Sequence, residues 1–345
     1  MINNLVPPKI SIICRTYNQE KFIGKAIQSV LNQSYTDWEL IVINDASTDR
    51  THEEILKFQD DRIRVIKNPE NKGPLANLNI GIESAKGEYI AILDGDDEYL
   101  PQKLEKQVHF LNDNLDYGAV FSYINTVDEN GKISDCKRCQ WAKKKLNNPA
   151  GTRAQMLRKC FGSYNFLAFP TEMFRKKYAI YFNEHLLAAG DGYFHISMLL
   201  KTKIKVLEEP LVNYRISKNS VATWITNYSW ISETFFLLDK FLEIKDIEFF
   251  KEIFKEDLDD FSVVEPSLFP YILTKLAEKY PDKRQWANYN FHRFISNIDN
   301  YRLLKNKLGF SYKDIIGTKR GFFEKIGKLK KIKMKLLRIL NFLKS

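Results

Sequence analysis

The sequence lacks several features that mark particular classes of protein. Only four cysteines occur among 345 residues, too few for the disulfide framework of a small secreted domain, so a reducing compartment is expected. The N-terminus has neither the basic nor the apolar region of a secretory signal, and no apolar run is long enough to span a bilayer. Together these absences predict a cytoplasmic protein without a membrane-spanning helix.

Excess charge is absent from most of the chain. The net charge is +10, but residues 318–345 alone hold ten Lys or Arg and one Glu. The other residues contain 43 basic and 42 acidic side chains and are almost neutral. A basic body would indicate a nucleic-acid partner, and none is expected here because the charge belongs to the tail.

The first 128 residues alternate short apolar runs with amphipathic stretches. This pattern predicts an α/β fold in which helices flank a mostly parallel sheet. Residues 151–220 show a mixed pattern, and residues 228–308 are almost wholly helical in character. Strands are expected at 10–14, 39–44, 63–66, 89–93 and 119–127, and helices at 20–33, 73–85 and 101–111, with another after a cap formed by Ser47, Thr48 and Asp49.

Polar side chains gather where three of the expected strands end. Arg15-Thr16-Tyr17-Asn18 follows the first strand, Asn44-Asp45 the second, and Asp94-Gly95-Asp96-Asp97 the fourth. Ligands of open α/β sheets bind at these carboxyl ends. Carboxylates brought together favour a bound cation, because like charges raise each other's pKa. The alternative for the last segment is an acidic surface turn.

The expected cation is Mg²⁺ or Mn²⁺. Residues 94–97 supply hard oxygen ligands in a tight turn, which suits an ion completed by phosphate oxygens. The sequence has no glycine-rich loop that would cradle phosphates with backbone N–H groups. A metal is therefore expected to hold them.

Five segments, in this order and spacing, resemble the opening of a family 2 glycosyltransferase, which is built on the GT-A fold. The resemblance is strong over about residues 7–111, weaker to about 220, and absent beyond. It implies an inverting, metal-dependent transfer of a sugar from a nucleotide diphosphate sugar, a UDP-sugar being favoured, to a saccharide acceptor in lipopolysaccharide, O-antigen or capsule biosynthesis. The segments are Pro8–Ile13 with Tyr17-Asn18, Gln28–Ser34, Glu39–Asp49, Asn71–Gly73 with Asn79, and Leu93–Asp97 with Pro101.

The resemblance also implies roles for the donor site. Thr16, Tyr17 and Glu20 would line the nucleoside pocket, with the Tyr17 ring near the base. Asp45 would accept a hydrogen bond from the base, and Asp94 would meet the ribose or the metal region. Tyr17 as an ordinary loop aromatic and Asp45 as a strand-end cap are the alternatives.

Asp96 would be the main metal ligand, and Asp97 would be either a second ligand or a cap of the turn. The sequence departs from the family at Leu78, where a basic residue often precedes the following Asn. A nucleotide contact is then either missing or replaced by Lys72 or Asn77, which weakens the choice of uracil as the base.

An inverting transfer needs a base to take the proton of the attacking hydroxyl. Asp191 stands at the expected start of a helix, where the helix dipole favours an ionised carboxylate. In the family a Glu precedes this Asp, and Gly190 replaces it here; an N-cap role for Asp191 is the alternative. Arg215 lies in a segment that resembles the loop closing over the donor, where it would balance the diphosphate charge or be a plain surface arginine. Ser217 stands where the family commonly has a His.

The tail predicts a further partner. Residues 322–344 form a basic amphipathic pattern that suits an anionic membrane surface, so a peripheral position on the inner face of the plasma membrane is expected. Packing on the helical module, a dimer contact and an RNA-binding arm are the alternatives. The expected partners are then a nucleotide-sugar donor, a saccharide or lipid-linked oligosaccharide acceptor, and the membrane.

These inferences predict three regions. Residues 1–225 are a GT-A glycosyltransferase domain, with the nucleotide-sugar site in about 1–128 and the acceptor side in about 129–225. Residues 226–317 form a helical C-terminal module, and 318–345 the basic helix. The competing functions are a catalytically silent scaffold or glycan-binding member of a polysaccharide assembly complex, and a nucleotidyltransferase, which would need a Gly- and Arg-rich phosphate loop after the first strand.

Overall fold

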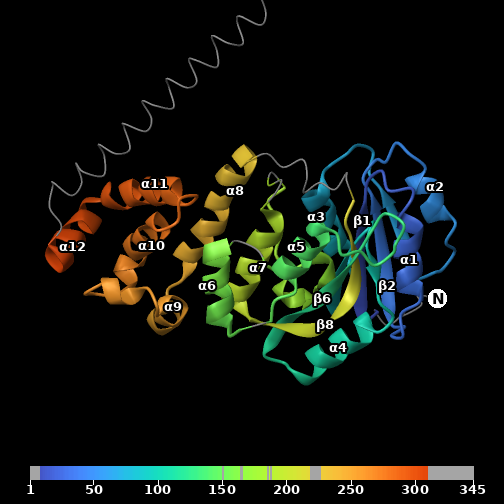
Figure 1. Ribbon diagram of the computed structural model, residues 1–345, viewed down its shortest axis with the longest axis horizontal. Helices are drawn as coiled ribbons and strands as arrows, with labels where there is room; N and C mark the ends of the chain where they lie inside the picture. The colour runs from blue at the N-terminus through green and yellow to red at the C-terminus, as the bar shows by residue number, and fades with distance from the viewer. Residues whose placement is uncertain are drawn as a thin grey trace, which may run out of the picture. The chain divides into compact units, whose positions relative to one another are not determined.

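The computed structural model describes residues 8–149, 151–163, 166–184, 186, 189–217 and 227–309 (Figure 1). The chain folds into two compact units, the first ending at Lys240 and the second beginning at Phe241. Helix α8 (Asn227–Asp239) is therefore part of the first unit, past the boundary expected near residue 225. The basic helix expected at 318–345 lies outside the described residues. No helix of the described part is both long and apolar enough to cross a membrane.

The first unit is built on one sheet, which has eight strands within the described residues, in the order β3-β2-β1-β4-β7-β6-β8-β5. The neighbours β3, β2, β1 and β4 run parallel, and β7 is antiparallel to both β4 and β6. Strand β8 is parallel to β6, and β5 is antiparallel to β8. The expected α/β class is confirmed. The strands are β1 (Ile10–Thr16), β2 (Trp38–Asn44), β3 (Ile63–Lys67), β4 (Tyr89–Asp94), β5 (Glu98–Tyr99), β6 (Tyr117–Val127), β7 (Met173–Arg175) and β8 (Lys203–Arg215).

Helices cover both faces of the parallel part of the sheet. Side chains of α1 (Ile23–Leu31) and α4 (Lys103–Asp113) pack with alternate residues of β1 and β2 in one buried cluster. Helix α3 (Pro74–Ser84) lies close against the other face of β1. A Cβ at Gly81 would stand 2.4 Å from Cγ2 of Ile13, so glycine permits this close approach. The remaining helices of the unit are α2 (Thr51–Leu56), α5 (Lys137–Leu146), α6 (Arg153–Ser163) and α7 (Gly190–Lys201).

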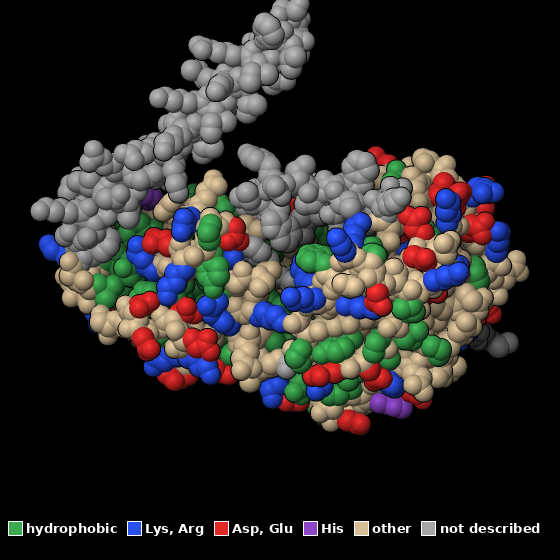
Figure 2. Space-filling view, viewed as in Figure 1, with side chains coloured by type: hydrophobic (Ala, Val, Ile, Leu, Met, Phe, Trp, Pro, Cys, Tyr) green, Lys and Arg blue, Asp and Glu red, His purple; other side chains and the backbone are tan. Residues whose placement is uncertain are grey.

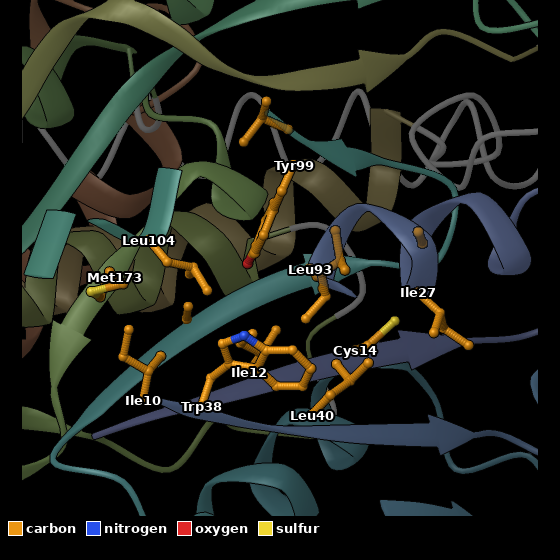
Figure 3. Close-up of a cluster of buried hydrophobic side chains, with 14 of the residues drawn as sticks. Ile10, Ile12, Cys14, Ile27, Trp38, Leu40, Leu93, Tyr99, Leu104 and Met173 are labelled. Carbon is orange, nitrogen blue, oxygen red and sulfur yellow. The ribbon is translucent and has the colours of Figure 1, made fainter. Parts of the chain in front are cut away.

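The core under the sheet is almost completely shielded from water. Figure 3 shows Ile12 and Cys14 of β1, Leu40 of β2 and Leu93 of β4 meeting in this cluster, and all four are fully buried. Burial of one such aliphatic side chain contributes about 1.5–3 kcal/mol to folding. The core fixes the three strands whose ends carry the polar segments.

Two helix starts differ from the expectation. Helix α1 begins at Ile23 rather than at Glu20, because the preceding loop bonds to the loop after β2: Glu20 N donates to Asp49 Oδ2 over 3.1 Å. Helix α2 begins at Thr51, and Arg50 is its N-cap. The Asp49 carboxylate accepts from Thr51 N over 2.9 Å, so the cap expected at residues 47–49 lies just outside the helix.

The second unit is helical within its described residues, as expected. Phe250 and Phe269 stack with ring centroids 3.8 Å apart, and Phe254 lies beside Phe250 at 5.0 Å. Trp286 is fully buried. Aromatic packing therefore holds this module together. Its helices are α9 (Ile247–Phe254), α10 (Phe269–Glu278), α11 (Arg284–Ile295) and α12 (Ile298–Leu308).

Charges of both signs are intermingled over the described surface that Figure 2 shows, as the near-neutral composition of the body predicts. Exposed ion pairs such as Lys203 Nζ to Asp116 Oδ2, at 2.6 Å, are typical of it. Such pairs add little to stability because water screens them. Two ion pairs that are more buried, Arg15 with Asp94 and Arg215 with Glu98, lie at the cavity described next.

Candidate active site

A cavity of about 1210 Å³ lies at the carboxyl ends of β1, β2 and β4. Its walls come from the loops after these strands, the starts of α3 and α7, helix α5 and the end of β8. The volume is ample for a ligand the size of a nucleotide sugar. The cavity is lined by every site residue predicted from the sequence: Thr16, Tyr17, Glu20, Asp45, Asp94, Asp96, Asp97, Asp191 and Arg215.

The loop after β1 is tied to the loop after β2. Asn18, at φ 52°, accepts at Oδ1 from Thr48 N over 2.8 Å. Glu20 Oε2 accepts from both N and Nε of Arg50, at 3.1 and 3.2 Å, and the backbone bond from Arg50 is the main cause that lowers the pKa of Glu20. Glu20 thus fixes the loop that presents Tyr17, whose side chain is 46% exposed at the cavity.

Asp45 is buried at the end of β2 and anchors the segment before α3. Its Oδ1 accepts from Asn68 Nδ2 and from Lys72 N, each at 2.8 Å. Its Oδ2 accepts from Gly73 N at 2.9 Å. Because a carboxylate oxygen can accept two hydrogen bonds, Oδ2 retains capacity for a further donor in the cavity.

The position where the family has a basic residue is turned into the core. Leu78 is fully buried. Of the two substitutes expected for it, Lys72 has an exposed side chain that does not line the cavity, whereas the Asn77 side chain does line it. Asn77 Oδ1 accepts from Asn68 Nδ2 over 2.7 Å, which joins it to the Asp45 network.

Arg15 clamps the first carboxylate of the acidic turn. Its Nε donates to Asp94 Oδ1 over 2.5 Å and its Nη2 to Asp94 Oδ2 over 3.3 Å, a two-point ion pair. A Cβ at Gly95 would come within 2.4 Å of Gln19 Oε1 and 2.8 Å of Thr16 Oγ1, so the turn needs glycine to approach the β1 loop.

The other two carboxylates of the turn are held in a partly dehydrated setting. Burial, reinforced by the charge of Asp94, raises the pKa of Asp96 to about 6. Asp97 is 2% exposed, and burial with the charges of Asp96 and Asp94 raises its pKa well above the ordinary value. Asp97 Oδ1 accepts from Arg215 N over 2.8 Å, so this carboxylate bridges the turn to β8.

Arg215 holds the acidic turn from the side of β8. Its side chain is fully buried: Nε donates to the Asp96 carbonyl oxygen over 2.8 Å, Nη1 to the Asp128 carbonyl oxygen over 2.6 Å, and Nη2 pairs with Glu98 Oε1. Reading Arg215 as a plain surface arginine is therefore wrong. Ser217 also lines the cavity, and Lys218–Ser220 of the expected loop lie outside the described residues.

Asp191 lies in the first turn of α7 and is partly buried. Burial raises its pKa to about 6; the charge of Asp94 adds to the rise, while Arg15 and Lys145 oppose it. A Cβ at Gly190 would stand 2.6 Å from Leu75 Cδ2, so a larger residue here would require the Leu75 side chain of α3 to shift. Glycine at this position is consistent with that close packing.

The acidic turn fits a metal ion that is shared with a phosphate ligand. Within the described residues no group of three or more His, Cys, Asp or Glu is placed to hold an ion unaided. Mg²⁺ commonly takes only one or two protein carboxylates, the rest of its shell being water and phosphate oxygens. The partly buried Asp96 carboxylate, whose pKa is raised by burial and by the charge of Asp94, is a position where a cation is favoured.

The cavity wall includes residues for which the sequence predicts no role, among them Arg15, Trp141 and Lys145. The signal available for Arg15 is its place at the end of β1. Trp141 and Lys145 of α5 both line the cavity, and they lie one helical turn apart. No motif marks them, because the sequence does not show which face of α5 the cavity meets.

The family model described as glycosyl transferase family 2 matches residues 11–180. The chain is 33% identical over 223 residues to an uncharacterized glycosyltransferase, MJ1057, of Methanocaldococcus jannaschii, covering 63% of this chain and 73% of the relative. It is 30% identical over 219 residues to the Escherichia coli UDP-Glc:alpha-D-GlcNAc-diphosphoundecaprenol beta-1,3-glucosyltransferase WfgD, covering 62% and 79%. Over several further curated relatives it spans less than half of their length.

The fold is similar to that of Staphylococcus aureus TarS 1–349 in complex with UDP-GlcNAc. The TM-score is 0.58 at 20% identity, and the match covers 88% of this chain and 93% of that one.

Proposed function

Because the chain belongs to the family 2 glycosyltransferases, we propose that it moves a sugar from a nucleotide diphosphate sugar, a UDP-sugar being favoured, to a saccharide acceptor of a cell-surface polysaccharide, with inversion at the anomeric carbon. The observation that carries this proposal is the shared cavity of Asp96 and Asp191. The names of two similar proteins support the donor class: UDP-Glc is in the name of WfgD, and UDP-GlcNAc is bound in TarS.

The nucleotide would bind where the loops after β1 and β2 meet. Asp45 Oδ2 has capacity for one more donor, as an N–H of the base would provide. Tyr17 lines the same cavity, and its exposed ring suits packing against a planar nucleobase. Thr16 and Asp94, which also line the cavity, would border the ribose.

The leaving group would face the acidic turn. Asp96, with Asp97 behind it, would hold Mg²⁺ or Mn²⁺, and this cation when bound neutralises charge on the departing diphosphate. Arg15 and Arg215 keep the turn in place through Asp94 and the Asp96 carbonyl oxygen. The role expected for Arg215 as a direct diphosphate contact becomes a positioning role, because each of its three side-chain nitrogens already donates to a protein oxygen.

Asp191 would act as the general base of the reaction. The acceptor hydroxyl attacks the anomeric carbon while its proton passes to the Asp191 carboxylate, and the bond from that carbon to the phosphate oxygen breaks. The nucleoside diphosphate departs with the bonding electrons. With Asp191 on the face opposite the leaving group, the new glycosidic bond has the inverted configuration.

A nucleotide-sugar panel with Mg²⁺ or Mn²⁺ and a set of saccharide acceptors tests the reaction. Release of a nucleoside diphosphate together with a glycosylated acceptor is the expected result. Pyrophosphate release would indicate nucleotidyl transfer instead, and no release from any donor would indicate a silent scaffold. The exposed Asp113 of α4 supplies the matched control: Asp113→Asn should keep full activity, whereas Asp96→Asn should lose most of it.

We also propose that residues 318–345 bind an anionic membrane surface, on the evidence of their ten basic side chains and apolar spacing. Each Lys or Arg near such a surface adds about 1 kcal/mol. Sedimentation of the whole chain with phosphatidylserine-containing vesicles should exceed that of the chain ending at residue 317. Equal sedimentation of the two would contradict the anchor.

A further inference from the structure

Helix α5 presents two side chains to the cavity that the proposed reaction does not use. Trp141 is 61% exposed and Lys145 is partly buried, and both line the cavity that contains Asp191. Lys145 Nζ lies 5.0 Å from the centroid of the Trp141 ring. Together they form a small patch, the α5 patch, with an aromatic face and one positive charge.

The Lys145 ammonium has no carboxylate partner within the described residues. Burial lowers its pKa, and the nearby charge of Asp191 partly restores it. Lys145 and Asp191, the proposed general base, line the same cavity. A substrate anion in the cavity would therefore supply the missing counter-charge.

The Trp141 side chain is largely exposed, although the Lys145 ammonium lies over its ring. Large aromatic side chains are normally well buried, so a tryptophan 61% exposed at a cavity wall is unusual. Its flat apolar face suits the C–H face of a sugar ring, which shields apolar surface while leaving the hydroxyls free to hydrogen-bond. Tryptophan also loses little side-chain entropy on binding.

We propose that the α5 patch is an acceptor subsite, in which Trp141 packs against a sugar ring and Lys145 pairs with an anionic group, phosphate or carboxylate, of the same acceptor. The subsite rests on the proposed sugar transfer, since it would bind the acceptor whose hydroxyl Asp191 deprotonates. Because Lys145 and Asp191 line one cavity, the anionic group belongs on the attacked sugar or on its neighbour. The acceptor class is thus an anionic saccharide.

The test uses the whole chain, Mg²⁺ and a panel of monosaccharides, each prepared as a neutral alkyl glycoside, an alkyl-diphosphate glycoside and a uronic acid. The variants are Trp141→Ala, Trp141→Phe and Lys145→Met. The matched control is Lys144→Met, because Lys144 is exposed on the same helix and does not line the cavity. Hydrolysis of the donor without acceptor reports donor binding separately.

Trp141→Ala should raise the acceptor KM about tenfold or more for every acceptor, and Trp141→Phe should restore most of it. Lys145→Met should raise the acceptor KM about tenfold for the anionic acceptors only. Comparison of the alkyl-diphosphate glycosides with the uronic acids identifies which anionic group Lys145 binds. The donor KM and the rate of donor hydrolysis should not change. Lys144→Met should match wild type.

Unchanged acceptor KM in Trp141→Ala overturns the subsite, and so does a Lys145→Met effect that is equal for neutral and anionic acceptors or that falls on the donor KM. The two proposals fail separately. If no nucleotide sugar releases a nucleoside diphosphate, sugar transfer is wrong, and the subsite is then judged by fluorescence: the glycan panel should quench wild-type tryptophan emission and not that of Trp141→Phe. Absence of quenching in wild type would also refute the subsite.

Discussion

The acidic turn and the wall formed by α5 and the start of α7 line the same cavity but are held differently. In the turn, Arg15 clamps Asp94, and Arg215 binds both the Asp96 carbonyl oxygen and Asp97. On the wall, Asp191 and Lys145 form no ion pair within the described residues, and Trp141 stands exposed. We infer that the side proposed for the leaving group is organised by the protein, whereas the proposed acceptor side would be completed by the substrate.

The largest expected effect is that of a substitution at Asp191, on the wall formed by α5 and the start of α7. Asp191→Asn keeps the shape of the side chain but cannot take the hydroxyl proton, so kcat should fall by about 10²- to 10⁴-fold. Binding of the nucleotide, measured by calorimetry, should stay the same. A fall in kcat of less than about tenfold, with Asp113→Asn at wild-type activity, would show that another group is the base.

The next effect concerns the constrained side. Arg215→Met leaves Glu98 and two carbonyl oxygens without their buried partner, so the free energy of unfolding of the first unit should drop by about 3 kcal/mol. Urea unfolding followed by tryptophan fluorescence measures the change. Lys203→Met, which removes an exposed ion pair, should leave the midpoint unchanged. An equally stable Arg215→Met protein would mean that the turn does not depend on this clamp.

The pH dependence of kcat tests Asp191, whose pKa depends on charges from both the acidic turn and helix α5. Asp191 has to be ionised to accept a proton, and burial raises its pKa to about 6. The value of kcat should therefore be level above that pH and fall about tenfold per pH unit below it. In Lys145→Met the break should move to higher pH, because the Lys145 charge lowers the pKa of Asp191. A profile that is level down to pH 4 would exclude this carboxyl group.

The smallest effect tests how firmly Asp45 is fixed. Asn68→Ala removes one hydrogen bond to Asp45 and one to Asn77. We expect this loss to weaken binding of the nucleotide at Asp45 by about 1 kcal/mol. The donor KM should rise about fivefold, with the acceptor KM unchanged. Asn32→Ala, at an exposed helix end, is the control. A change in the acceptor KM, with the donor KM unchanged, would show that Asp45 does not contribute to donor binding.

Much of the parallel half of the sheet could be predicted from the sequence. Strands β1, β2 and β4 are continuous apolar runs, and the polar residues that matter follow each strand directly, as Asp45 follows β2. Sequence neighbours of a strand end must lie at that end of the sheet. Polar residues that directly follow these strands, such as Asp96, therefore lie in one cavity. Asp191, in the first turn of α7, lines the same cavity.

The rest depends on contacts between distant segments. Strand β7 has only three residues, too few for a periodic signal, yet it separates β4 from β6 in the sheet. Arg215 lines the cavity and also bonds to a turn that lies more than a hundred residues earlier in the chain, a contact that no local pattern predicts. The approach of α5 to Asp191 likewise has no local signature. Such contacts follow from packing and not from pattern.

The anomeric configuration of the product tests the central claim most directly. Proton NMR of the purified product gives the coupling constant at the newly linked anomeric carbon, to be compared with that of the donor. The proposed mechanism predicts inversion, since in it the Asp191 carboxylate and the leaving group at Asp96 would lie on opposite faces of the sugar. A product that retains the donor configuration would contradict it.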